Sequence, residues 1–175
     1  MLLQIIFGFS LALLRLSAAC HGASHSGQTA NPQDIPQDLM ITLERTGCFG
    51  ICPVYKLTIA ADGAVVFEGR RFVKEAGATK KSAINREQLK ELLAEVDRVK
   101  FFLEDDYSSD SRVCNEGMDD SQATITSIRI NGKSKTVSHF DGCTGPKGPK
   151  DIAELEKKID EIVNTAQWLL DVKGR

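Results

Sequence analysis

The chain has 175 residues, a formal net charge of −2, 42% hydrophobic residues and 26% charged residues. This composition is ordinary for a globular protein. Lys and Arg residues form no basic stripe in the sequence, so we do not expect a nucleic-acid partner. The length favours a single domain. After the N-terminal leader, no segment approaches the roughly 20 apolar residues that a membrane-spanning helix needs.

Residues 1–19 are predicted to be a signal peptide. Leu2–Leu14 is almost wholly apolar, and small residues at positions 17–19 precede Cys20. Residues 16–20 resemble a bacterial lipobox, whose cysteine becomes the lipidated mature N-terminus. Arg15 and the lack of a basic residue before the apolar core depart from that pattern, so cleavage after Ala19 without lipidation is the alternative. We expect export to the periplasm, outer membrane or cell surface, and membrane attachment only through Cys20.

Residues 20–37 are predicted to form a flexible tether. They are rich in Gly, Ser, Asn, Gln and Pro, with Ile35 as their one large apolar side chain. Such a segment buries too little apolar surface to offset the entropy lost on ordering. The folded domain is therefore expected over residues 38–175.

Alternating apolar side chains predict three strands, over Leu39–Thr46, Pro53–Ala60 and Ala64–Gly69. Asp62-Gly63 predicts a type I′ hairpin turn between the second strand and the third. The inward-facing residues are expected to be Leu39, Ile41, Leu43, Tyr55, Leu57, Ile59, Val65 and Phe67.

A helix is predicted over Asn85–Lys100. Asn85 and Gln88 have the spacing of a capping box, in which each side chain bonds the backbone N–H of the other residue. Apolar residues at helical spacing predict one buried face, formed by Leu89, Leu92, Leu93, Val96 and Val99.

A second hairpin is predicted from Ala123–Ile130 and Lys133–Phe140, joined by a type I′ turn at Asn131-Gly132. The apolar alternation changes phase within the first of these strands, which predicts a bulge near Thr126-Ser127. A final helix is expected over Asp151–Leu170. The order βββαββα predicts an α+β domain in which an antiparallel sheet carries both helices on one face.

Four cysteines remain after Cys20, and an even number in an exported protein favours disulfides. Cys48 and Cys52 lie in the connection between the first two strands, where Gly50 is expected to take a positive φ in a tight turn. Cys114 and Cys143 flank the second hairpin at its open end. We therefore favour the pairs Cys48–Cys52 and Cys114–Cys143 among the three possible pairings.

The same residues leave two other functions open. Cys48, Cys52, His139 and Cys143 offer ligands of the kind that zinc prefers, although their spacing is looser than a C-x-x-C knuckle. Thiol redox chemistry at Cys48 and Cys52 is the second alternative, but redox pairs normally stand at a helix N-terminus that lowers the thiol pKa.

Residues 45–59, which read RTGCFGICPVYKLTI, resemble a bacterial family of domains of unknown function numbered six-four-three-eight. Its hallmark is R-T-x-C-x-G-x-C-P-x-Y, followed by an extended run and a D-G turn. The matching positions here include Arg45, Gly50, Pro53 and Tyr55. The similarity covers about residues 39–170. It implies an exported or lipoprotein-type protein and no known activity.

No segment carries a catalytic or cofactor-binding motif, so we expect neither an enzyme nor a cofactor. The acidic stretch Glu104–Asp120 lacks the ordered spacing of an EF-hand, and a solvated loop is the better interpretation than a calcium site. We expect an envelope protein that binds an unknown partner or has a structural role. The alternative is a metal-binding or thiol-redox protein that uses the cysteines and His139.

Lipidation can be tested directly. If residues 16–20 act as a lipobox, radiolabelled palmitate should be incorporated and globomycin should block maturation. A Cys20→Ala variant serves as the control. Absence of label in the parent chain would leave simple cleavage after Ala19.

Overall fold

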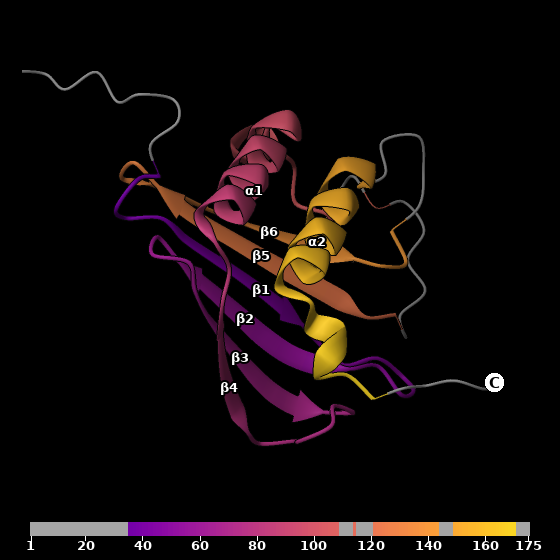
Figure 1. Cartoon of the computed structure of the whole chain (residues 1–175). Coiled ribbons are helices and arrows are strands. Elements are labelled where there is room, and N and C mark those ends of the chain that lie inside the picture. Colours follow the sequence, from indigo (N-terminus) through magenta and orange to yellow (C-terminus); the bar gives the residue numbers. More distant parts are fainter. Residues whose placement is uncertain (1–34, 109–113, 115–120, 144–148, 171–175) are drawn as a thin grey trace, which may run out of the picture. The chain divides into compact units, whose positions relative to one another are not determined.

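A six-stranded antiparallel sheet with two α-helices forms the domain (Figure 1). This computed structural model describes residues 35–108, 114, 121–143 and 149–170, so Cys20, the leader, most of the tether and much of the acidic stretch lie outside the described residues. The elements are β1 Met40–Arg45, β2 Val54–Ala60, β3 Ala64–Arg71, β4 Thr79–Ala83, α1 Arg86–Arg98, η1 Phe101–Leu103, β5 Ala123–Ile130, β6 Lys133–Phe140, α2 Lys150–Val163 and η2 Thr165–Gln167.

The α+β class is confirmed, but the order is ββββαββα and the predicted order was wrong by one strand. The sheet runs β4-β3-β2-β1-β5-β6. The missed strand, β4, reads TKKSA and pairs with β3 at the edge of the sheet. It has no apolar alternation because an edge strand outside the core needs no buried side chain, and its lysines discourage pairing with other chains.

The two hairpin turns differ in type. Asn131 and Gly132 both have positive φ, as the predicted type I′ turn between β5 and β6 requires. Between β2 and β3, only Gly63 has positive φ, and its N–H donates to Ala60 O at 2.9 Å. That connection is a three-residue loop with glycine in the left-handed position, so the predicted type I′ turn there was wrong.

One face of the sheet carries the core, and in Figure 1 both helices lie over the same side of the sheet. Every predicted inward residue of β1, β2 and β3 is buried. The helices contribute apolar side chains to the same cluster, namely Leu89, Leu92, Val96, Ile152, Leu155, Ile159 and Val163. This burial is the main favourable contribution to folding.

The predicted bulge near Thr126-Ser127 is absent. β5 pairs with β1 and with β6 in continuous register over its whole length. Thr124, Thr126 and Ile128 alternate on the buried face, and the two threonines are fully buried. The apparent change of phase arose because polar threonines occupy core positions while Ile125 lies on the opposite face.

The start of α1 and the end of α2 are marked by asparagine residues. Asn85 caps α1 through the predicted capping box with Gln88. The last helix was predicted too long, because Asn164 adopts a left-handed conformation and ends α2 at Val163. A short 3-10 turn then brings Trp168 against Phe67, with ring centroids 4.7 Å apart. Among the described helices, none has the length and apolar character needed to cross a membrane.

Gly63 provides a test of the β2–β3 turn. A Cβ at Gly63 would collide with the backbone oxygen of Ile84, whereas a Cβ at Gly77 would meet nothing within 4 Å, and both residues have positive φ. Gly77→Ala should therefore lower the free energy of unfolding by about 1–2 kcal/mol, and Gly63→Ala by about 2–4 kcal/mol. Urea denaturation of both variants measures the difference. Equal losses would show that the turn relaxes around the added methyl group.

Candidate functional site

A row of polar side chains crosses the covered face of the sheet near one end. Arg45 on β1 pairs in register with Tyr55 on β2 and with Thr124 on β5, and Thr124 pairs in turn with His139 on β6. Residues directly opposite each other in antiparallel strands share a face. We call these four residues the polar row.

Arg45 is the centre of this row, and α2 supplies its counter-ion. Its Nη2 and Nε lie 2.8 and 3.0 Å from Asp160 Oδ2, and its Nη1 donates to Thr124 Oγ1 at 2.9 Å. Tyr55 OH donates to Asp160 Oδ1 at 2.7 Å. One guanidinium group therefore links β1, β2 and β5 to α2.

A second carboxylate of α2 covers the other half of the row. Glu156 Oε2 lies 2.7 Å from His139 Nδ1, and both residues are buried. Thr126 Oγ1 donates to Glu156 Oε1 at 3.4 Å. Because Glu156 and Asp160 are four residues apart, they lie on the same face of α2.

The environment changes the pKa of three of these groups. Burial, reinforced by the charge of Asp160, raises the pKa of Tyr55. For Arg45, burial opposes the charged form, but Asp160 and Tyr55 outweigh it and raise the pKa. Burial raises the pKa of Glu156, and the hydrogen bond from His139 only partly offsets this. The raised pKa values keep the Arg45 guanidinium charged beside Asp160 and keep the Tyr55 hydroxyl neutral.

The segment that joins Arg45 to Tyr55 is held at its base by hydrogen bonds. Thr46 extends the pairing of β1 with β5, since its backbone N–H and its Oγ1 both bond to Ala123. Gln122 Nε2 donates to Thr46 O at 2.7 Å and to Pro53 O at 2.8 Å, so one amide spans both sides of the loop.

The cysteines lie in the two favoured pairs. Cα–Cα distances are 5.8 Å for Cys48–Cys52 and 5.0 Å for Cys114–Cys143, within the usual range for disulfides. Their sequence separations are 4 and 29. In the chain-entropy account, the longer bridge contributes about 3–4 kcal/mol and the shorter about 2 kcal/mol. Cys48–Cys52 therefore constrains mainly the shape of its loop.

Gly50 does not adopt the positive φ that was expected to explain a glycine in this loop. Among the described glycines, positive φ occurs at Gly63, Gly77 and Gly132, so the predicted positive φ at Gly50 was wrong. A Cβ there would stand 3.7 Å from Cys48 Sγ, an ordinary contact. The structure gives no steric reason for glycine at this position.

The residues considered for zinc do not converge on one point. Their cysteines belong to two separate disulfides, and His139 Nδ1 is engaged by Glu156. Within the part of the chain that the structure describes, no group of three or more His, Cys, Asp or Glu side chains could hold a metal ion. In this disulfide form, the four cysteines that the structure describes offer no thiolate for zinc binding or for nucleophilic attack.

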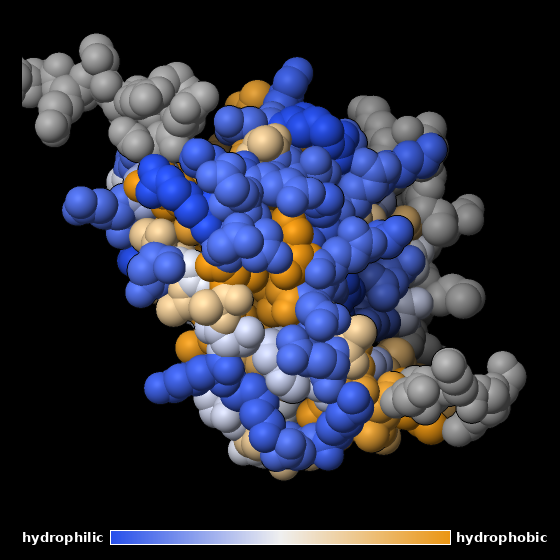
Figure 2. Space-filling view, in the orientation of Figure 1, coloured by the Kyte–Doolittle hydropathy of each residue, from blue (hydrophilic) through white to orange (hydrophobic). Residues whose placement is uncertain are grey.

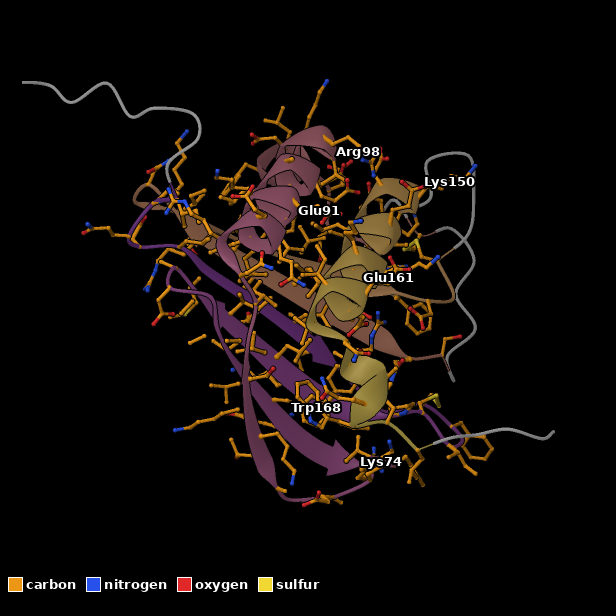
Figure 3. All side chains as sticks on the ribbon, in the orientation of Figure 1. Lys74, Glu91, Arg98, Lys150, Glu161 and Trp168 are labelled. Carbon is orange, nitrogen blue, oxygen red and sulfur yellow. A yellow bond between two sulfur atoms is a disulfide. The ribbon has the colours of Figure 1, made fainter. Side chains whose placement is uncertain are left out.

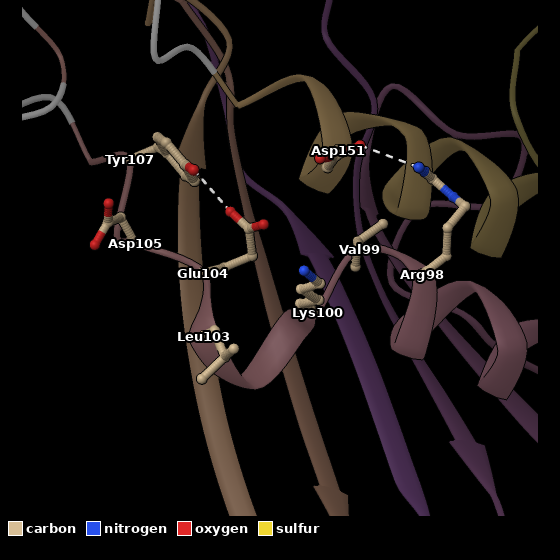
Figure 4. Close-up of a pocket in the computed structure, with 8 residues that line it drawn as sticks. All are labelled: Arg98, Val99, Lys100, Leu103, Glu104, Asp105, Tyr107 and Asp151. Carbon is tan, nitrogen blue, oxygen red and sulfur yellow. Dashed lines mark hydrogen bonds and ion pairs between the residues drawn. The ribbon is translucent and has the colours of Figure 1, made fainter.

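Figure 4 shows a pocket of about 450 Å³ near the end of α1 and the start of α2. Its charged groups are largely engaged with each other: Tyr107 OH donates to Glu104 Oε2 at 2.7 Å, and Arg98 Nη1 donates to Asp151 Oδ1 at 3.1 Å. Its lining residues are Arg98, Val99, Lys100, Leu103, Glu104, Asp105, Tyr107 and Asp151.

Comparison with protein families gives one match. A family model described as a domain of unknown function, DUF6438, matches residues 39–163. The chain belongs to this family. The matched range of the DUF6438 domain begins just before β1 and ends with α2, so it includes the polar row and both of its carboxylate partners. A search of curated proteins finds no match.

Sequence reasoning identified Arg45, Tyr55 and His139 in this DUF6438 domain but missed Thr124, Glu156 and Asp160. A signal for Glu156 was present. Ile152, Glu156, Ile159 and Val163 follow one helical face, and a carboxylate among buried apolar positions requires a partner. The pairing itself had no local signal, because no spacing rule connects Glu156 to His139, which lies 17 residues earlier on β6.

The Arg45 pair can be tested against an exposed pair on the same sheet. Arg45→Met leaves Asp160 and Tyr55 partly buried without their cation, and should lower the free energy of unfolding by about 2–4 kcal/mol. Arg70→Met removes an ion pair with Glu44 whose side chains are 48% and 28% exposed, and should change stability by at most about 1 kcal/mol. Urea titrations compare them. Equal effects would exclude a special role for Arg45.

Glu156 makes stability depend on pH. Because its pKa is raised above the ordinary value of 4.5 in the folded state, the unfolded chain releases this proton first, and stability falls as pH rises from about 4.5 to the raised pKa. Glu156→Gln has no proton to release, so its stability does not fall in this window. The free energy of unfolding of the variant, relative to that of the parent, should therefore increase with pH, by about 1.4 kcal/mol for each pKa unit by which folding raises the pKa of Glu156.

Urea denaturation of the parent and the Gln variant at a series of pH values measures this difference. The exposed Glu161→Gln on the same helix controls for loss of a carboxylate. A stability difference between parent and Glu156→Gln that stays constant with pH would contradict the assignment.

Proposed function

We propose that this protein is exported and acts in the cell envelope as a non-enzymatic binding module, through an exposed apolar surface at one end of its sheet. The leader and tether patterns of residues 1–37 support export. Two cysteine pairs at bonding distance also fit an oxidising compartment.

The observation that carries the binding role is the loop closed by Cys48 and Cys52. This loop exposes Phe49 to 88% and Ile51 to 46%. Large apolar side chains are costly to leave in water, and clusters of them commonly mark interaction sites. The disulfide and the Gln122 bonds hold the loop in place, so little conformational entropy is lost when it binds.

Two further apolar side chains belong to the same end of the sheet. The isolated bridge between Val73 and Leu169 brings the chain after β3 beside the C-terminal segment, which places the exposed Phe72 next to the exposed Leu170. Figure 2 shows hydrophobic atoms gathered at the lower right, where Figure 1 places the β1–β2 loop. We call Phe49, Ile51, Phe72 and Leu170 the apolar end.

Replacement of the exposed loop residues separates binding from folding. Phe49→Ser with Ile51→Ser should leave the free energy of unfolding within about 0.5 kcal/mol of the parent, because these side chains pack on little. A photocrosslinking amino acid at position 49 should give a discrete adduct in the envelope of producing cells. The same probe at Ser134, exposed near the opposite end of β6, is the control.

Equal, diffuse crosslinking from positions 49 and 134 would contradict a binding surface at the apolar end. Recovery of the uncleaved chain from the cytoplasm with all five cysteines as free thiols would contradict export.

A further inference from the structure

Two basic side chains at the apolar end make no ion pair with any acidic side chain among the residues that the structure describes. Arg71 stands with its guanidinium carbon 6.0 Å from the centre of the Phe72 ring, and a Cβ at Gly47 would collide with its Nη2. Arg71 therefore lies between the disulfide loop and Phe72. Lys74 follows two residues later, and its Nζ donates to Gln167 O at 2.8 Å. Figure 3 shows Lys74 close to Trp168 at this end of the sheet.

Two described carboxylates near this end already have partners. Glu44 pairs with Arg70 at 2.5 Å, and Glu75 pairs with Lys80 at 2.6 Å. Among the described residues, neither Arg71 nor Lys74 makes an ion pair with a carboxylate. Counted over the described residues, the apolar end therefore combines protruding Phe, Ile and Leu side chains with two cations in excess.

We propose that the apolar end docks on an anionic phospholipid surface, with Phe49 and Ile51 entering the interface and Arg71 and Lys74 contacting lipid phosphates. This rests on the proposed function and specifies its partner. Apolar and aromatic side chains beside Lys or Arg are the composition of interfacial membrane contacts. An 88% exposed Phe49 protrudes from the surface, which suits insertion into a fluid layer.

The chain enters the domain at the end opposite the apolar end, and the residues before it are numerous enough to allow this docking. Asp38, just before β1, accepts hydrogen bonds from Asn131 N and Gly132 N at 2.8 and 2.7 Å, so the chain enters at the β5–β6 turn, opposite the apolar end. An eight-residue strand spans roughly 27 Å. The fifteen residues from 20 to 34 can span up to about 50 Å. A chain held at Cys20 can thus turn the apolar end back to the same membrane, where tethering raises its effective concentration.

The test asks whether position 49 touches lipid. Full chains carrying Phe49→Trp or Ser134→Trp are added to vesicles of phosphatidylglycerol with brominated acyl chains, and tryptophan quenching is compared with that of the parent, whose one tryptophan is Trp168. Because the readout depends on position, binding through the leader does not imitate it. Trp at position 49 should be quenched and its emission should shift to the blue, while Trp at position 134 should not.

The charge dependence supplies a second readout. Arg71→Gln with Lys74→Gln should reduce the lipid-contacting population of position 49 about tenfold or more, and neutral phosphatidylcholine vesicles should do the same. If Trp at position 49 stays unquenched on the anionic vesicles, the lipid inference is wrong. A discrete protein adduct from position 49 in cells would then leave the binding module intact with a protein partner, whereas no adduct would overturn both proposals.

Discussion

The guanidinium of Arg45 joins the two layers of the domain. Its donors reach Asp160 on α2 and Thr124 on β5, while Tyr55 on β2 completes the contact with Asp160. A partly buried cation without its carboxylate would be strongly destabilising, so α2 must pass over β1 with Asp160 facing inward. Apolar packing alone is non-directional and would permit neighbouring placements of the helix. The ionic contact selects one of them.

The same contact fixes the base of the disulfide loop. Arg45 and Tyr55 are register partners at the ends of β1 and β2, and the loop begins and ends beside them. Thr46, Gln122 and the Cys48–Cys52 bridge then restrict the intervening backbone. A backbone fixed in this way holds Phe49 away from the core, where its side chain is 88% exposed. The polar contacts at the ends of β1 and β2 thus help to determine which apolar side chains the loop exposes to solvent.

Much of this fold could be predicted from the sequence, for identifiable reasons. Alternation located β1, β2 and β3 because one face of each is buried, and Asn131-Gly132 marked the second hairpin because few other pairs tolerate two positive φ angles. Asn85 and Gln88 marked the start of α1 through a local bond pattern. Each of these signals lies within a few residues of the feature that it predicts.

The predictions failed for two kinds of feature. Some depend on contacts between residues that are distant in the sequence, and others are elements that bury few side chains and so show no apolar periodicity. β4 lies at an edge and buries almost nothing, so its sequence shows no period. Thr124 and Thr126 are polar residues at core positions because Arg45 and Glu156 bond to their hydroxyl groups, and local alternation therefore suggested a bulge that is not there. Asp160 is 115 residues from Arg45. No spacing rule connects them before the sheet order is known.

The sheet order also governs the route by which the chain can fold. β1 lies at the centre, between β2 and β5, yet Met40 of β1 pairs with Arg129 of β5, far away in the sequence. Synthesis delivers β1 to β4 first, as a meander whose β1 edge has no neighbour and whose apolar face has no α2. Such an intermediate exposes unpaired backbone and hydrophobic surface together, the combination that promotes association with other chains. Prompt synthesis of β5 and α2 would therefore shorten the time for which this aggregation-prone intermediate is exposed.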